Sequence, residues 1–240
     1  MSLTDWIPRP RPHRTNLDGD YIRLEPLDPA RHGDELFEAG SGPDRDMLWR
    51  YLADRPFPDR SSFEPWLARA AASEDPLFFA AVDRDTGRAE GRLALMRIDP
   101  GNGVVEVGHI LFGPRLARSR GATEAIFLLA RWVFDGLGYR RFEWKCDNRN
   151  EPSKRAAVRF GFSYEGLFRQ HMVVKGENRD TAWFAMTDRD WPSRKAAYEQ
   201  WLLPSNFDTT GRQVKALSGL MERASSREAE ANEPRNAPVG

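Results

Sequence analysis

Residues 104–162 constrain the fold of this chain more than any other segment, because they predict five elements in a fixed order. The elements are a strand, a basic turn, a long amphipathic helix, a second strand and a short helix. They occupy, in that order, VVEVGHILF at 104–112, RLARSRGATEA at 115–125, residues 123–137, FEWKCD at 142–147 and residues 152–161. The order places the start of a long helix, where N–H groups are unpaired and the dipole is positive, beside a group of arginines.

The rest of the chain predicts an α+β fold with a mixed, mostly antiparallel twisted sheet flanked by helices. Short alternating or apolar runs predict further strands at 21–26, 77–82, 88–98, 163–174 and 179–187. Helices are predicted at 30–39, 61–72 and 191–203. We expect an extended N-terminal arm over 1–18, one main domain over 19–191, a helical extension over 192–222 and a disordered polar tail over 223–240.

The composition of the chain limits the classes of function that it can have. The chain has 36 basic and 36 acidic residues, so no global charge favours nucleic acid as a partner. Its one cysteine, Cys146, allows no intrachain disulfide, and we expect a buried structural thiol in a reducing compartment. No apolar run reaches the about 20 residues of a membrane helix, and the first residues lack a secretory h-region. These features predict a cytoplasmic protein with no membrane partner.

The basic turn predicts an anion site. Arg115, Arg118 and Arg120 precede the helix with no acidic residue until Glu124. Arginines at a helix start oppose the dipole, so the cluster is unfavourable unless an anion binds there. The small residues between and after them would let a phosphate approach the backbone; these are Ser119, Gly121 and Ala122.

Several motifs along the chain resemble the GNAT superfamily of acyl-CoA N-acyltransferases, and most closely the branch of the ribosomal-protein acetyltransferases RimJ and RimL. The motifs are EVGHI at 106–110, ATEA at 122–125, LGYRRFEWKCD at 137–147, NEPS at 150–153, GF at 161–162, EG at 165–166 and RDTAWFAM at 179–186. The turn departs from the family's Gln/Arg-x-x-Gly-x-Gly/Ala pattern. When the chain is aligned on ATEA, Ala117 takes the first position and Arg120 takes the glycine position.

The resemblance implies acetyl-CoA as co-substrate, with succinyl-CoA as an alternative donor and no metal. Two central strands would part, and the pantetheine arm would lie between them on the main chain of Ile110, Leu111 and Phe112. Asn150 would bind the pantetheine amides or, alternatively, cap a helix. The pyrophosphate would contact the turn and helix start, formed by Arg115, Arg118, Ser119, Arg120, Gly121, Ala122 and Thr123.

Two residues are candidates for catalysis. Glu106 is the candidate general base, because an attacking amine must lose a proton and a carboxylate can accept it through water. Strand alternation places Glu106, Gly108 and Ile110 on one face, although an ordinary strand glutamate is the competing interpretation. Many family members protonate the leaving thiolate with a tyrosine, and that position is Ala157 here. In the RimL-like branch a serine has this role, which implies Ser153, unless Ser153 only caps its helix.

The acceptor is expected to be a primary amine on a protein N-terminus, a lysine or a small molecule. Trp49 and Tyr51 lie in the variable segment that shapes the acceptor pocket in this superfamily, but they could equally serve core packing. A homodimer is implied by resemblance alone. Two other functions stay open: a non-catalytic CoA or nucleotide sensor, and a nucleic-acid partner that uses Arg9, Arg11 and Arg14.

Overall fold

The computed structural model describes residues 3–223, so the predicted polar tail lies outside the described residues apart from Arg223. One sheet of eight strands has the order β1-β2-β3-β4-β5-β6-β8-β7. Its neighbours are antiparallel except for β5 and β6, which run parallel. The predicted mixed, mostly antiparallel sheet is confirmed. The strands are β1 (Leu17–Asp18), β2 (Ile22–Pro26), β3 (Leu77–Asp83), β4 (Ala89–Asp99), β5 (Val104–Phe112), β6 (Arg141–Asp147), β7 (Ser163–Val174) and β8 (Glu177–Thr187).

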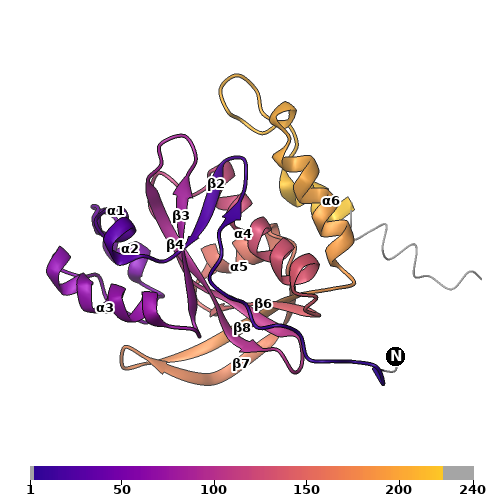
Figure 1. Ribbon diagram of the computed structural model, residues 1–240, viewed down its shortest axis with the longest axis horizontal. Coiled ribbons are helices and arrows are strands. Elements are labelled where there is room, and N and C mark those ends of the chain that lie inside the picture. The colour runs from indigo at the N-terminus through magenta and orange to yellow at the C-terminus, as the bar shows by residue number, and fades with distance from the viewer. Residues whose placement is uncertain (1–2, 224–240) are drawn as a thin grey trace, which may run out of the picture.

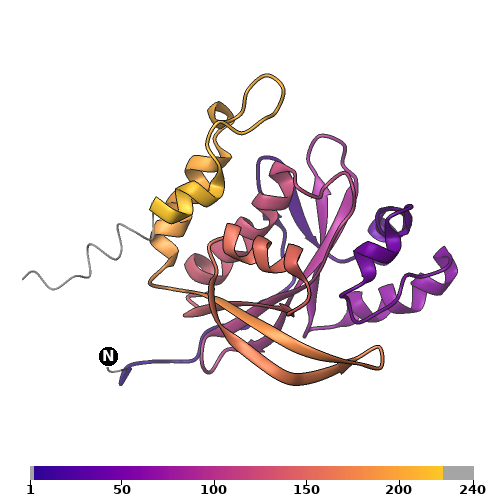
Figure 2. The ribbon, with the colours of Figure 1, turned by 180° about the vertical axis from the view of Figure 1, so that it is seen from behind.

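Helices cover both faces of the sheet (Figures 1 and 2). On one face α1 and α3 pack on β3 and β4 around a small apolar core, while α4 packs on the other face within the larger core. The helix α6 lies beside α4 (Figure 1). The helices are α1 (Pro29–Ser41), α2 (Arg45–Trp49), α3 (Arg60–Ala72), α4 (Arg120–Arg131), a π-helical turn (Trp132–Gly136), α5 (Glu151–Arg159), α6 (Trp191–Leu202) and a 3₁₀ turn (Pro204–Asn206).

The two central strands part halfway along their length. β5 and β6 are paired from Val104 and Arg141 as far as Val107 and Trp144, and no further. Beyond that point β5 continues along β4, and β6 continues along β8 as far as Asp147. The predicted separation of the central strands is therefore confirmed, and each strand has one unpaired main-chain edge facing the gap.

A bulge in β5 shifts the alternation of its side chains. Arg92 of β4 lies opposite Leu111, but Ala94 lies opposite Gly108, so β5 holds one extra residue there, and His109 has φ +51°. Ile110 and Phe112 consequently pack on the α4 side, as Val105 and Val107 do. The prediction that Glu106 and Ile110 share a face is therefore wrong, because simple alternation takes no account of an inserted residue.

The starts of two elements differ from the prediction by two residues or more. α4 begins at Arg120 rather than Thr123, because the side chain of Ser119 caps it by accepting a hydrogen bond from the N–H of Ala122 at 3.1 Å. β8 begins at Glu177, because the turn after β7 needs only Lys175 and Gly176. Both shifts lengthen an element at the expense of a loop.

The N-terminal arm packs along the domain. Trp6 donates its indole N–H to the carbonyl of Gly101, and Arg14 donates to the carbonyls of Ala71 and Ser73. Arg11 pairs with the carboxylate of Asp75 at 3.5 Å. The guanidinium of Arg9 lies 4.4 Å from the ring centre of Trp6, so all three arginines of this arm make contacts within the chain itself.

Candidate active site

A cavity of about 1170 Å³ opens where β5 and β6 part. Ile110 and Phe112 line it from β5, and Trp144 lines it from β6. It continues past Asn150 and Ser153 at the start of α5 to the N-terminus of α4. Ligand pockets in proteins commonly measure roughly 300–1,000 Å³, so this cavity has room for a long ligand. The predicted β5 residue Leu111 does not line it; its side chain is buried in the interior.

The basic turn borders the cavity at the start of α4. Arg118 is exposed with φ +64°, and Arg118, Ser119 and Arg120 all line the cavity, as do Gly121, Ala122 and Thr123. The acid of this helix, Glu124, points away: its carboxylate accepts from the backbone N–H groups of Asp20, Tyr21 and Ile22. The helix start therefore presents its N–H groups and guanidinium groups to the cavity, whose lining also includes Asp83 and Asp85.

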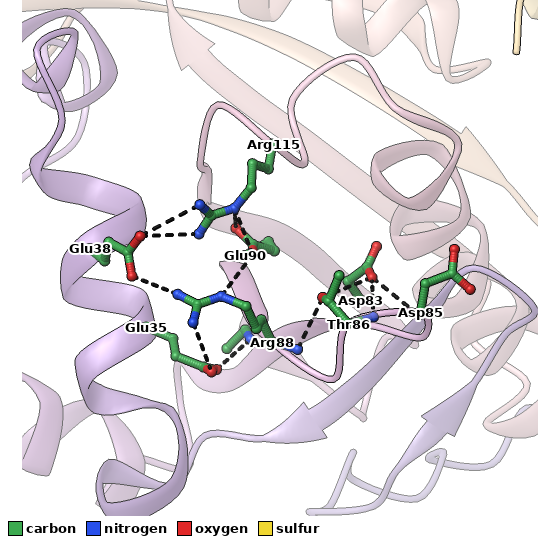
Figure 3. Close-up of polar contacts among 9 residues, drawn as sticks. Glu35, Glu38, Asp83, Asp85, Thr86, Arg88, Glu90 and Arg115 are labelled. Atoms are coloured by element: carbon green, nitrogen blue, oxygen red, sulfur yellow. Dashed lines mark hydrogen bonds and ion pairs between the residues drawn. The ribbon is translucent and has the colours of Figure 1, made fainter. Parts of the chain in front are cut away.

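Arg115 lines the cavity, but its guanidinium is bound to carboxylates of the chain itself. Its guanidinium binds Glu90 of β4 at 2.8 Å and reaches Glu38 of α1 at 3.4 Å (Figure 3). Arg88 joins the same two carboxylates. Because Glu90 is buried, its charge requires these partners. Arg115 thus anchors the turn to α1 and β4, and its positive charge is already compensated.

Arg159 of α5 is a cavity residue that the sequence did not reveal. Its Nη1 donates to Thr123 Oγ1 at 3.1 Å, beside the first turn of α4. No carboxylate in residues 3–223 pairs with it, and burial lowers the pKa of its guanidinium below the usual value. A desolvated cation without a counter-ion is unfavourable, so this position favours an anionic ligand. A lone arginine late in a polar helix gives no sequence signal for this role.

Ser153 and Asn150 lie where β6 passes into α5. Ser153 Oγ accepts a hydrogen bond from Trp144 Nε1 at 3.0 Å, and the Ser153 hydroxyl also interacts with the thiol of Cys146. Asn150 caps α5 by accepting from the N–H of Ser153 at 3.1 Å. Cys146 is buried, as expected, and burial raises the pKa of its thiol. Ser153 and Asn150 both line the cavity near the fork.

Glu106 lies one residue before the strands part. Its Oε2 is 2.7 Å from Arg97 and 3.0 Å from Lys145, and its side chain is 4% exposed. Its Oε1 carries neither ion pair and lies 3.8 Å from the place where a Cβ on Gly108 would stand. Both ion pairs of the carboxylate thus use Oε2, while Oε1 faces Gly108, the first residue of β5 beyond its pairing with β6.

The two predicted acceptor residues take structural roles in this chain. Trp49 is 4% exposed, donates its indole N–H to Gly40 and packs on Phe57, so its side chain is part of the interior. The indole of Trp49 is enclosed by the protein, and its contact with substrate stays a prediction. Tyr51 is half-buried and donates its hydroxyl to the carbonyl of Arg149 at 3.0 Å, which ties this segment to the loop after β6.

Arg92 supports the bulge from the opposite face. It is 2% exposed, its Nη1 donates to the carbonyl of His109 at 2.8 Å, and its guanidinium lies 4.3 Å from the Trp66 ring. Burial lowers the pKa of Arg92 to about 10. Burial, followed by the charge of Arg92, lowers the pKa of His109 to about 4. Nothing in the strand pattern around Arg92 predicts this buried arginine, which we interpret as fixing the path of β5.

Residues 22–163 match the family model of the acetyltransferase (GNAT) domain. The chain belongs to the GNAT acetyltransferase family. It is similar to a solved GCN5-related N-acetyltransferase from Brucella melitensis, with 55% identity, a TM-score of 0.91, and coverage of 92% of this chain and 100% of that one. It is also similar to a structure from Chromobacterium violaceum described as a probable acetyltransferase of the GNAT family, with 42% identity, a TM-score of 0.74, and coverage of 80% and 96%.

A curated relative from Bacillus licheniformis, named uncharacterized N-acetyltransferase p20, is 29% identical over 113 residues. That match spans 47% of this chain and 63% of the relative. The GNAT domain match ends at Ser163, the first residue of β7, so α6 and the segment after it lie outside it. In residues 3–223 no helix is long and apolar enough to cross a membrane.

Proposed function

We propose that this protein is an acyl-CoA-dependent N-acyltransferase that transfers an acetyl group directly to a primary amine. The observation that carries the proposal is the continuous cavity from the fork of β5 and β6 to the N-terminus of α4. A CoA thioester has matching parts: an extended amide chain for the unpaired strand edges, and a diphosphate for the helix start.

The chemistry would take place at the fork. The amine nitrogen attacks the thioester carbonyl carbon, the C–S bond breaks, and an amide and a thiol form. The developing oxyanion would be held by main-chain N–H groups of β5 beyond the bulge. Ser153 would give its proton to the leaving sulfur, because its oxygen already accepts from Trp144. Oε1 of Glu106, which forms neither ion pair, would receive the proton of the amine, directly or through water, and solvent would return a proton to the oxygen of Ser153.

The proposal is tested by a screen of amines with acetyl-CoA and with succinyl-CoA, in which free CoA thiol is detected. We expect thiol release that depends on both the amine and the donor. The screen includes peptides with free N-termini, peptides with internal lysine and small polyamines, because these separate the acceptor classes. If no pair releases thiol above the rate of hydrolysis while the protein remains folded, the proposal fails.

A non-catalytic CoA sensor is the second candidate. It is favoured by Ala157, which is fully buried at the position where many relatives carry a tyrosine acid, and by the two cations on Glu106. Saturable binding of CoA without turnover of any amine would favour the sensor over the enzyme. The RimJ and RimL relationship, a homodimer and a cytoplasmic location remain proposals that rest on family resemblance and composition.

A further inference from the structure

The wall of the cavity near α4 comes from outside the matched GNAT domain. Residues of α6 and of the segment that follows it line the cavity opposite the basic turn; they are Trp201, Phe207, Gly211, Arg212 and Gln213. Trp201 holds this wall together, because its indole N–H donates to Gln213 at 2.9 Å and its ring meets Phe207 edge-on at 5.0 Å. The C-terminal segment is therefore a packed part of the site.

This wall positions Arg120. The guanidinium carbon of Arg120 lies 3.9 Å from the ring centre of Phe207 and 5.1 Å from that of Tyr21. Tyr21 in turn donates its hydroxyl to the carbonyl of Leu202 at 3.1 Å. A guanidinium between two aromatic rings keeps the N–H groups at its edge available for an oxyanion. Without Phe207 the long side chain of Arg120 would lose one of these two supports.

Arg159 and Arg212 add charge to the same end of the cavity. Arg159 lies 5.2 Å from the Trp201 ring and makes its hydrogen bond to Thr123 on the side of α4 that faces α5. Arg212 lines the cavity from the C-terminal segment. Within residues 3–223, no carboxylate forms an ion pair with Arg118, Arg120, Arg159 or Arg212. Asp83 and Asp85 also line the cavity, but neither forms an ion pair with these four arginines, which can therefore bind phosphate oxygens beyond those of the diphosphate.

We propose that the C-terminal segment, together with Arg120 and Arg159, forms a subsite for the phosphorylated nucleotide end of CoA and selects for its 3′-phosphate. The inference rests on the proposed use of a CoA thioester. A phosphate monoester adds about 1.5–2 negative charges near pH 7, and the four arginines without carboxylate partners can bind it in addition to the diphosphate. A phosphate accepts strong, charge-assisted bonds from guanidinium groups, whereas an adenosine 3′-hydroxyl does not.

The test compares dissociation constants for CoA and dephospho-CoA, which differ only in the 3′-phosphate, by titration calorimetry. For the wild-type protein we expect CoA to bind roughly 10- to 100-fold more tightly, the range for a hydrogen bond to a charged group. In Arg159→Gln, which keeps a donor for Thr123, the ratio should fall towards one, with little change for dephospho-CoA. Phe207→Ala should also lower the ratio, because Arg120 loses its support.

The matched control is Arg155→Gln, which removes an exposed arginine from the same helix and should leave the ratio unchanged. Melting temperatures of the variants check that each is folded. If the wild-type protein binds both ligands equally, or if Arg155→Gln lowers the ratio as much as Arg159→Gln, the inference is overturned and the proposed function survives. If neither ligand binds, the proposed function fails as well.

Discussion

Oε2 of Glu106 lies 3.0 Å from Nζ of Lys145, on neighbouring strands just before the strands part. Lys145 also pairs with Glu143 at 2.6 Å, and its side chain is 5% exposed. The candidate base is therefore oriented by a buried network. This arrangement leads to the first two predictions, one for stability and one for catalysis.

Lys145→Met should destabilise the fold strongly. Without Lys145 the two buried carboxylates keep only the partly exposed Arg97 and Arg141 as partners, and loss of one partner of a buried pair typically costs about 3–5 kcal/mol. The free energy of unfolding from urea titration measures this cost. Lys195→Met, which breaks the exposed pair with Asp135, is the control and should cost less than about 1 kcal/mol. An equal loss of unfolding free energy in the two variants would show that the buried network stabilises the fold no more than an exposed ion pair does.

Glu106→Gln should lower turnover while CoA affinity stays nearly constant. The loss should be greatest at low pH, where the amine is mostly protonated, and smallest at high pH, where it is already neutral. Rate profiles of both proteins from pH 6 to pH 9 provide the measurement. If the ratio of the two rates does not change with pH, Glu106 is not the base.

Ser153→Ala should reduce turnover by roughly 100-fold, the lower range for general-acid catalysis. A thioester with a more acidic thiol needs less protonation of its leaving group, so the loss should shrink with such a donor. A purely structural role would give the same loss for both donors. The comparison is made at saturating amine, and the melting temperature shows whether the unpaired Trp144 indole destabilises the fold.

His109 should make stability depend on pH. Its folded pKa of about 4 is below the unfolded value of 6.5, so the unfolded chain binds the proton more readily. The contribution is fully present above pH 6.5 and is lost as the pH falls towards 4, by about 2–3 kcal/mol. His109→Asn, which tolerates the positive φ, should weaken this dependence in urea titrations at pH 7 and pH 4.5. If the pH dependence of stability is the same in His109→Asn as in the wild-type protein, His109 is not a buried neutral imidazole.

The fold was largely predictable because its strands and helices carry clear local patterns. β5 and β7 match their predicted ranges, and the fork follows from the family order of elements. The bulge was not predictable, because a single extra residue leaves VVEVGHILF apparently regular. The prediction that Ile110 lies on the same face of the strand as Glu106 was therefore wrong.

The site was only partly predictable. The turn from Arg118 to Thr123 lines the cavity, since small residues and arginines at a helix start carry their own signal. Contacts between residues distant in sequence give no such local signal. Examples are the ion pair of Arg115 with Glu90, the burial of Trp49, and the contact of Phe207 with Arg120. Such roles depend on tertiary packing and can be read only from coordinates.

The central claim is that the forked strands and the start of α4 bind a CoA thioester. Titration calorimetry of CoA against the wild-type protein and Arg120→Glu tests it most directly. We predict saturable binding of one CoA per chain by the wild-type protein, and loss of that binding when a negative charge replaces the guanidinium at the helix start. Absence of binding by the folded wild-type protein at millimolar CoA, or equal affinity in the two proteins, would contradict the account.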